Sequence, residues 1–144
     1  MLSPQAAQER AAALVERARK AGADAADAVF MADASESLSI RLGKLEDVER
    51  SESEHIGLRV FVGRRSASIG SSDLADAALD ELAERAVAMA SAAPEDPYAG
   101  LAPEELLFQG PFPQLDLEDA GEPSPQALRV LAEAAEELVR EATT

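Results

Sequence analysis

The sequence contains no cysteine and only one histidine, His55. The lack of cysteine excludes disulfides, thiolate nucleophiles and every metal site built from thiolates. A zinc site built from histidine needs several ligands at a fixed spacing, which one imidazole cannot supply. The sequence therefore predicts no catalytic residue, no cofactor-binding residue and no metal ligand in this chain.

Aromatic residues make up only 3% of the 144 residues, and tryptophan is absent. Much of the 47% hydrophobic content is alanine, whose small side chain buries little apolar area. A domain of this length still removes roughly 68–70% of its unfolded surface from water. We therefore expect one domain of ordinary size whose core depends on close helix packing.

Basic residues are also scarce, because 13 Lys and Arg oppose 28 Asp and Glu, for a formal net charge of −15. Such a charge repels phosphate backbones and anionic membranes, so we predict no direct binding to nucleic acid or membrane. The N-terminal residues lack the apolar segment of a secretory signal. No run approaches the roughly 18 apolar residues of a membrane span. We expect a cytoplasmic protein whose partners are proteins, peptides or metal-bearing sites.

The pattern over residues 1–93 predicts an α+β domain, with an antiparallel, meander-like sheet and helices packed against it. Ser3 and Pro4 are typical of a helix start. A second helix is predicted over residues 74–92, capped by the polar pair Ser72–Asp73. The stripes expected to be buried are Ala7, Ala11, Leu14, Ala18 and Ala21 in the first helix, and Ala75, Leu79, Leu82, Ala86 and Met89 in the second.

Between these helices, apolar and polar residues alternate as in strands with one buried face. Two-residue hairpin turns are predicted at Gly43–Lys44 and Gly63–Arg64. The broken alternation at Leu45 and Val48 predicts a bulge, and the apolar run Val29–Met31 predicts a strand covered on both faces. Residues assigned to the inner face are Leu38, Ile40, Leu42, Ile56, Leu58, Val60 and Val62; those assigned to the outer face include Gly57, Arg59, Phe61 and Gly63.

Prolines and glycines cluster in residues 94–124, which we interpret as a surface strap with one short helical turn at 103–107. Residues 125–144 are predicted to form a final helix, because Ser124 and Pro125 repeat the start signal. Its apolar face is Leu128, Leu131, Ala135 and Leu138. This helix ends without a C-cap glycine, so we expect the chain to be a shortened form of a longer protein.

Arg59, Arg64 and Arg65 form a small basic spot in an acidic sequence. It could contact a carboxylate or an acidic patch of a partner, or it could balance local charge, and both alternatives stay open. His55 is interpreted as a solvated turn residue. The acidic run over residues 46–54 is interpreted as a solvated strand face that keeps a sheet edge soluble.

Two segments carry a resemblance to a known family: GLRVFVG over residues 57–63 and EDPYAGL over residues 95–101. With the flanking helices, they make residues 11–138 resemble the N-terminal domain of the TldD/PmbA family, historically called modulators of DNA gyrase. EDPYAGL favours the PmbA (TldE) branch. The resemblance implies that TldD-type and PmbA-type subunits pair into a cytoplasmic zinc metalloprotease that degrades peptides and unfolded segments.

The resemblance further implies that an H-E-x-x-x-H motif in the C-terminal half of the TldD subunit holds zinc. It also implies that the N-terminal domains of the family help to enclose an inner chamber. The motif does not occur in this chain, so zinc is expected only in the partner subunit or in the C-terminal half of the parent. The predicted function is a non-catalytic N-terminal domain of a PmbA/TldE-like subunit, with a TldD-like subunit and a peptide substrate as partners. The alternatives are an adaptor that modulates DNA gyrase and a freestanding enzyme.

A binding mode without a side-chain signature is also open to this chain. If the segment Lys44–Ser53 lies at an exposed sheet edge, its backbone could pair with an extended peptide.

Overall fold

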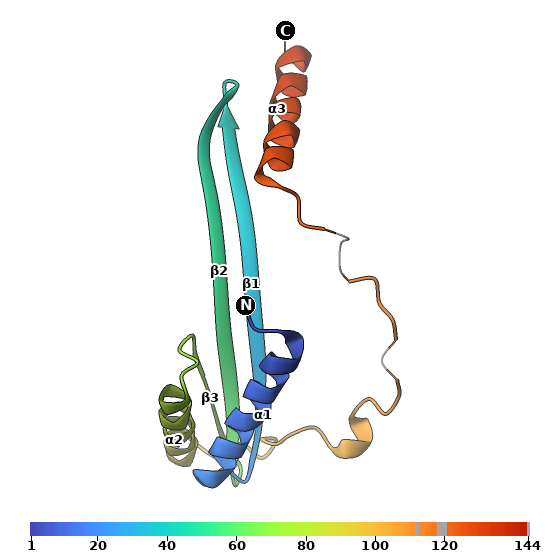
Figure 1. Ribbon diagram of the computed structural model, residues 1–144. Coiled ribbons are helices and arrows are strands. Elements are labelled where there is room, and N and C mark those ends of the chain that lie inside the picture. Colours follow the sequence, from blue (N-terminus) through green and yellow to red (C-terminus); the bar gives the residue numbers. More distant parts are fainter. Residues whose placement is uncertain (112, 118–120, 144) are drawn as a thin grey trace. The chain divides into compact units, whose positions relative to one another are not determined.

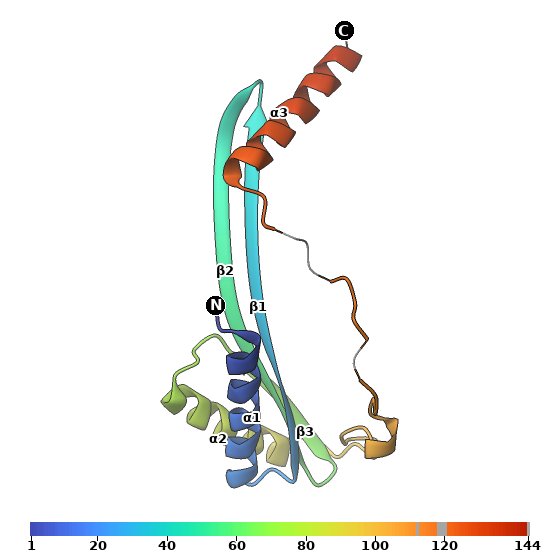
Figure 2. The same ribbon diagram turned by 45° about the vertical axis from the view of Figure 1, so that its right-hand side comes forward.

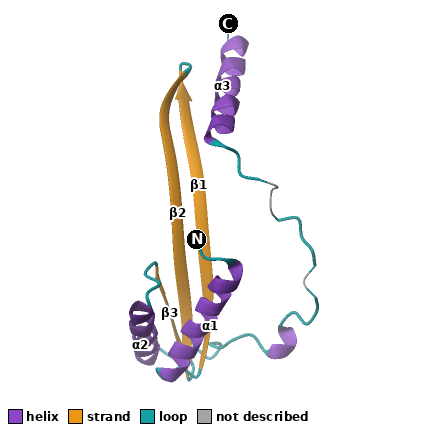
Figure 3. Ribbon diagram, viewed as in Figure 1, coloured by secondary structure: helices purple, strands orange, loops and turns teal. Residues whose placement is uncertain are grey.

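The computed structural model describes residues 1–111, 113–117 and 121–143 of the chain (Figure 1). It divides into two compact units, one made of Met1–Asp33 with Ser53–Phe108, and the other of Ala34–Glu52 with Gln109–Thr144. The elements, coloured by type in Figure 3, are α1 (Pro4–Lys20), β1 (Ala25–Arg41), β2 (Lys44–Val62), β3 (Arg65–Ser71), α2 (Asp76–Ala92), the 3₁₀ turn η1 (Glu104–Leu106) and α3 (Pro125–Ala142). Helices and an antiparallel sheet in this order confirm the predicted α+β class.

The sheet has the order β1-β2-β3. β2 pairs antiparallel with β3 from Ile56 opposite Ser71 to Val62 opposite Arg65. The turn at Gly63–Arg64 is confirmed, and Gly63 adopts the positive φ of 58° that suits glycine there.

The first hairpin turn lies one residue earlier than predicted. It consists of Leu42 and Gly43, with φ angles of 53° and 72°, in place of Gly43–Lys44. A two-residue turn with both central residues at positive φ matches the twist of the flanking strands, and glycine is preferred in it. Leu42 therefore occupies the exposed turn instead of the inner face.

Two ion pairs join β1 and β2. Arg41 pairs with Glu46 next to the turn, and Asp27 pairs with Arg59 farther along. The side chains of both pairs are largely exposed, and a long arginine side chain can reach more than one position of the neighbouring strand. These pairs therefore do not fix the register, and the bulge expected at Leu45 and Val48 stays a prediction.

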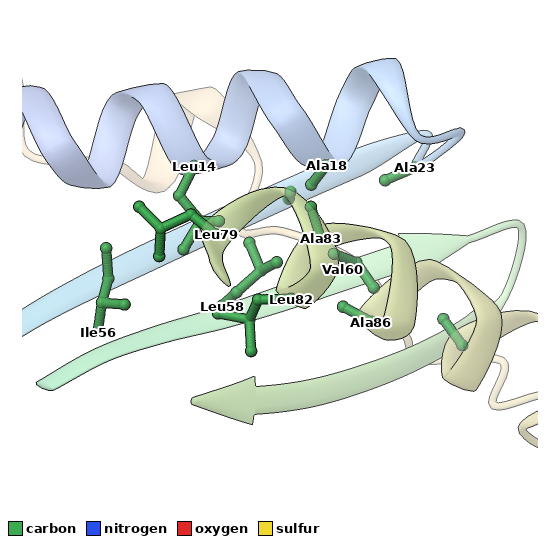
Figure 4. Close-up of a cluster of buried hydrophobic side chains, with 12 residues drawn as sticks. Leu14, Ala18, Ala23, Ile56, Leu58, Val60, Leu79, Leu82, Ala83 and Ala86 are labelled. Carbon is green, nitrogen blue, oxygen red and sulfur yellow. The ribbon is translucent and has the colours of Figure 1, made fainter. Parts of the chain in front are cut away.

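The core of the first unit lies between α1, α2 and the inner face of the sheet (Figure 4). Ile56, Leu58 and Val60 are buried there, as their alternation predicts. Six of the twelve residues of this buried cluster are alanine: Ala18, Ala23, Ala26, Ala83, Ala86 and Ala90. Small side chains let the helices approach each other and the sheet closely, which confirms the expected kind of core.

Two predictions about buried residues are wrong. In α2 the buried stripe includes Ala83 and Ala90, whereas Met89 is 46% exposed and Ala75 is exposed. At 3.6 residues per turn, the buried positions define a face on which Met89 lies at the edge. Val29 and Met31 are also exposed, at 54% and 53%. They lie on the outer sheet face with Arg59, whereas Phe61, assigned to the same face, is only 4% exposed.

Two of the three helices begin at the capping residue that the sequence predicts. The hydroxyl oxygens of Ser3 and Ser124 accept hydrogen bonds from the backbone N–H groups of Ala6 and Ala127, each at 3.2 Å. α2 instead begins at Asp76, after a turn in which a carboxylate oxygen of Asp73 accepts from the N–H of Ala75. Asp73 therefore stabilises the preceding turn and does not cap the helix.

In the second unit, α3 contacts the distal part of the β1–β2 hairpin. The N–H of Gly43 donates to Glu136 at 2.8 Å, and Leu128 lines a hollow with Glu36 and Arg50. Leu131 and Leu138 remain largely exposed. No helix in the described part of the chain is long and apolar enough to cross a bilayer.

Candidate functional site

The outer face of the sheet in the first unit contains a shallow hollow of about 550 Å³. All three strands contribute to it, because residues two apart on a strand point to the same face. Its residues include Asp27, Val29 and Met31 from β1, His55, Gly57 and Arg59 from β2, and Ser68 and Gly70 from β3. The hollow therefore combines an apolar wall, an imidazole, a hydroxyl and an ion pair.

A pair of glycines, Gly57 opposite Gly70, forms the floor of this hollow. A methyl group added to Gly57 would lie 3.2 Å from Val29 Cγ1. One added to Gly70 would lie 2.3 Å from His55 Nε2 and 3.1 Å from the carbonyl oxygen of Ile56. The two glycines therefore leave room for the side chains of Val29 and His55 to lie across neighbouring strands.

The interpretation of His55 as a turn residue is wrong. It lies within β2, which continues without a break from Lys44 to Val62, and its side chain is partly buried over Gly70. The described residues contain no group of three or more His, Asp or Glu side chains placed to hold a metal. His55 therefore contributes to the wall of the hollow.

Arg59 is held in place by a bidentate ion pair with Asp27. Its guanidinium also lies 5.3 Å from the centre of the Phe61 ring, within the range of a cation–π contact. The hydrogen bond to Asp27, together with its negative charge, raises the pKa of Arg59 above the ordinary value. Arg59 thus presents a fixed, paired charge at the rim of the hollow.

Arg64 and Arg65 have partners in the strap that follows α2. Arg64 donates to the carbonyl oxygen of Pro97 at 3.2 Å, and its own carbonyl accepts from the N–H of Asp96 at 2.7 Å. Arg65 donates to the carbonyl oxygen of Ser91 and to Glu95. These contacts tie the start of the strap to the second hairpin. Contact of the three arginines with a partner stays a prediction.

The close approach of the His55 side chain to Gly70 predicts that substitutions at these two positions have coupled effects on stability. We expect Gly70→Ala to lower the free energy of unfolding by about 1 kcal/mol, because the new methyl group forces the imidazole and the Ile56 carbonyl to move. In a His55→Ala background the cost should be smaller, because only the contact with the Ile56 carbonyl oxygen remains and alanine suits a strand better than glycine. Urea unfolding of the four proteins measures the coupling; effects that add within about 0.3 kcal/mol would contradict it.

Comparisons with known proteins place the sequence in a family. Residues 26–90 match the domain described as PmbA/TldA metallopeptidase domain 1. The chain is 33% identical over 132 residues to the metalloprotease PmbA homolog of Haemophilus influenzae, covering 87% of this chain and 29% of that protein. It is 36% identical over 107 residues to metalloprotease PmbA of Escherichia coli O157:H7, covering 74% of this chain and 23% of that protein. The chain thus spans less than a third of the length of these relatives.

The fold has a counterpart among solved structures. A Bacteroides thetaiotaomicron protein described as a modulator of DNA gyrase matches with a TM-score of 0.74 at 21% identity, covering 83% of this chain and 27% of that one. This likeness shows a shared fold, and the sequence matches to the two PmbA proteins agree with it. The chain therefore belongs to the TldD/PmbA family, and its residues 26–90 form the family's first domain.

Proposed function

We propose that this chain acts as the non-catalytic N-terminal domain of a PmbA/TldE-like subunit in a heteromeric zinc metallopeptidase of the cytoplasm. In this role it shapes the chamber that admits peptides and contributes contacts to a TldD-like subunit. The observation that carries the proposal is the match of residues 26–90 to the first domain of a metallopeptidase family, in a chain with one histidine and no cysteine.

The donor set supports a role without metal chemistry in this chain. Zinc in proteins is held mostly by cysteine and histidine, with carboxylates as additional ligands. Carboxylates are abundant here, but no three acidic or histidine side chains of the described residues converge. Hydrolysis in the proposed assembly therefore depends on residues supplied by the TldD-like subunit.

The open outer face of the sheet supports a role in contacts. Val29 and Met31 expose apolar surface beside the Arg59–Asp27 ion pair. An apolar centre with a charged rim is the usual composition of an interface between proteins. We propose this face as the contact with the partner subunit.

The proposal predicts that activity and zinc depend on the partner. The purified chain should contain no stoichiometric zinc by mass spectrometry and should not cleave an unstructured peptide. It should elute together with a TldD-like subunit that carries H-E-x-x-x-H. One zinc per chain, or cleavage that persists after repurification of this chain alone, would contradict the proposal.

A matched pair of variants tests the contact face. Arg59→Gln should weaken co-elution with the TldD-like subunit, whereas Arg85→Gln on the exposed side of α2 should not. Equal co-elution of both variants would place the contact elsewhere.

Saturable binding to purified gyrase at physiological salt, without binding to the TldD-like subunit, would favour the adaptor function instead.

A further inference from the structure

The distal part of β2 has an open edge. The pairing of β2 with β3 ends at Ile56 opposite Ser71, whereas β2 extends back to Lys44. Over residues 44–52, β1 is the only described strand that pairs with β2. In Figures 1 and 2, β3 lies beside the other end of β2, far from the turn that joins β2 to β1. Backbone N–H and C=O groups along one side of nine residues therefore lack a strand partner in the described chain.

This part of the hairpin also lacks the burial that stabilises a sheet. Every residue from Lys44 to Glu52 is exposed, including the apolar Leu45 and Val48. A two-stranded ribbon is marginally stable in water, and a third strand makes it considerably more stable. An added strand would supply both the missing hydrogen bonds and cover for the apolar side chains.

The charges along the edge select the kind of strand that fits. Residues 44–52 contain four acidic residues, Glu46, Asp47, Glu49 and Glu52, and two basic ones, Lys44 and Arg50. Glu46 and Glu52 have arginine partners, whereas Asp47 and Glu49 have no ion pair among the described residues. A second copy of this edge would bring like charges together, which destabilises strand pairs. A cationic strand would find complementary charge instead.

We propose that residues 44–52 of β2 form a strand-addition site for an extended, cationic polypeptide segment. Hydrogen bonds between main chains provide the binding energy, and alternate side chains provide the preference for lysine or arginine. The nine residues span about 30 Å, enough for an extended segment of similar length. The inference rests on the sheet and its charges, so it holds whether or not the chain pairs with a metal-bearing subunit.

The first test compares two labelled peptides of eight residues, one alternating lysine and valine and the other alternating glutamate and valine. Fluorescence anisotropy with the full chain should show saturable binding of the lysine peptide, and at least about tenfold weaker binding of the glutamate peptide. Equal affinities for the two peptides, or no binding of either, would overturn the proposal.

A second test separates strand pairing from general attraction of cations. Only every second N–H of an added strand bonds to the edge. N-methylation of one alternate set of lysine-peptide nitrogens should therefore abolish binding, and methylation of the other set should leave it. Bound peptide should also slow hydrogen exchange at alternate amides within residues 44–52. Equal effects of the two methylation sets, or protection confined to other residues, would contradict strand addition.

Matched charge variants locate the site. Asp47→Lys with Glu49→Lys and Glu81→Lys with Glu84→Lys each change the net charge by the same amount, the second pair on exposed positions of α2. Only the first pair should weaken binding of the lysine peptide, by about tenfold. Equal weakening would assign the binding to net charge alone. Circular dichroism checks that both variants keep their secondary structure.

Discussion

Replacing Leu58 by alanine is expected to lower the free energy of unfolding of the first unit by about 3 to 4 kcal/mol. Leu58 is only 2% exposed and lies on the central strand, facing α1 and α2. Many of its neighbours in the cluster are alanines, which cannot extend into the space that the lost side chain leaves. The cavity should therefore persist and add its full cost to the lost burial. Chemical denaturation monitored by circular dichroism measures the change.

A pair of valines on opposite sheet faces provides the control. Val60 is fully buried on the inner face, and Val29 is largely exposed on the outer face. Val60→Ala should cost about 2 kcal/mol, whereas Val29→Ala should stay within about 0.5 kcal/mol. Similar costs for the two variants would mean that the outer face is buried in solution, and would contradict the described core.

Enlarging Ala86 should destabilise the protein by about 2 kcal/mol, because the helix approaches the sheet too closely for a larger side chain. Ala86 is fully buried in the middle of α2. A leucine at this position can fit only if the helix moves away from β2 and β3, which separates the other buried alanines from their contacts. The free energy of unfolding of Ala86→Leu measures this cost directly.

The matched control is Ala88→Leu, the same change two residues along the same helix. Ala88 is exposed, so the added side chain meets water and the helix propensity hardly changes. Its stability should remain within about 0.5 kcal/mol of the parent. A stabilising Ala86→Leu variant would show that the core contains unfilled space and that close packing does not explain its alanines.

Local patterns predicted the parts of the fold that depend on local physics. Alternation over residues 56–62 assigned the buried face, and Ser3 and Ser124 marked two helix starts. The turn at Leu42–Gly43 and the exposed Met89 were missed because they depend on register and on the closeness of tertiary contacts. Such features emerge only when several elements are packed together.

The candidate site was only partly visible in the sequence. Arg59 was singled out for its charge, but its partner Asp27 lies on another strand, 32 positions earlier. The Gly57–Gly70 pairing depends on the register of β2 and β3. The period-two pattern of Asp27, Val29 and Met31 is a signal that could have indicated a shared outer face. The apolar run obscured it, because consecutive apolar residues suggest cover on both sides.

The abundance of alanine in the core also bears on how the protein responds to temperature. The heat capacity increment of unfolding grows with the apolar surface that becomes hydrated. A cluster in which half of the buried residues are alanine exposes comparatively little such surface. The free energy of unfolding of the protein should therefore change little with temperature. The fold should lose stability slowly on both cooling and warming.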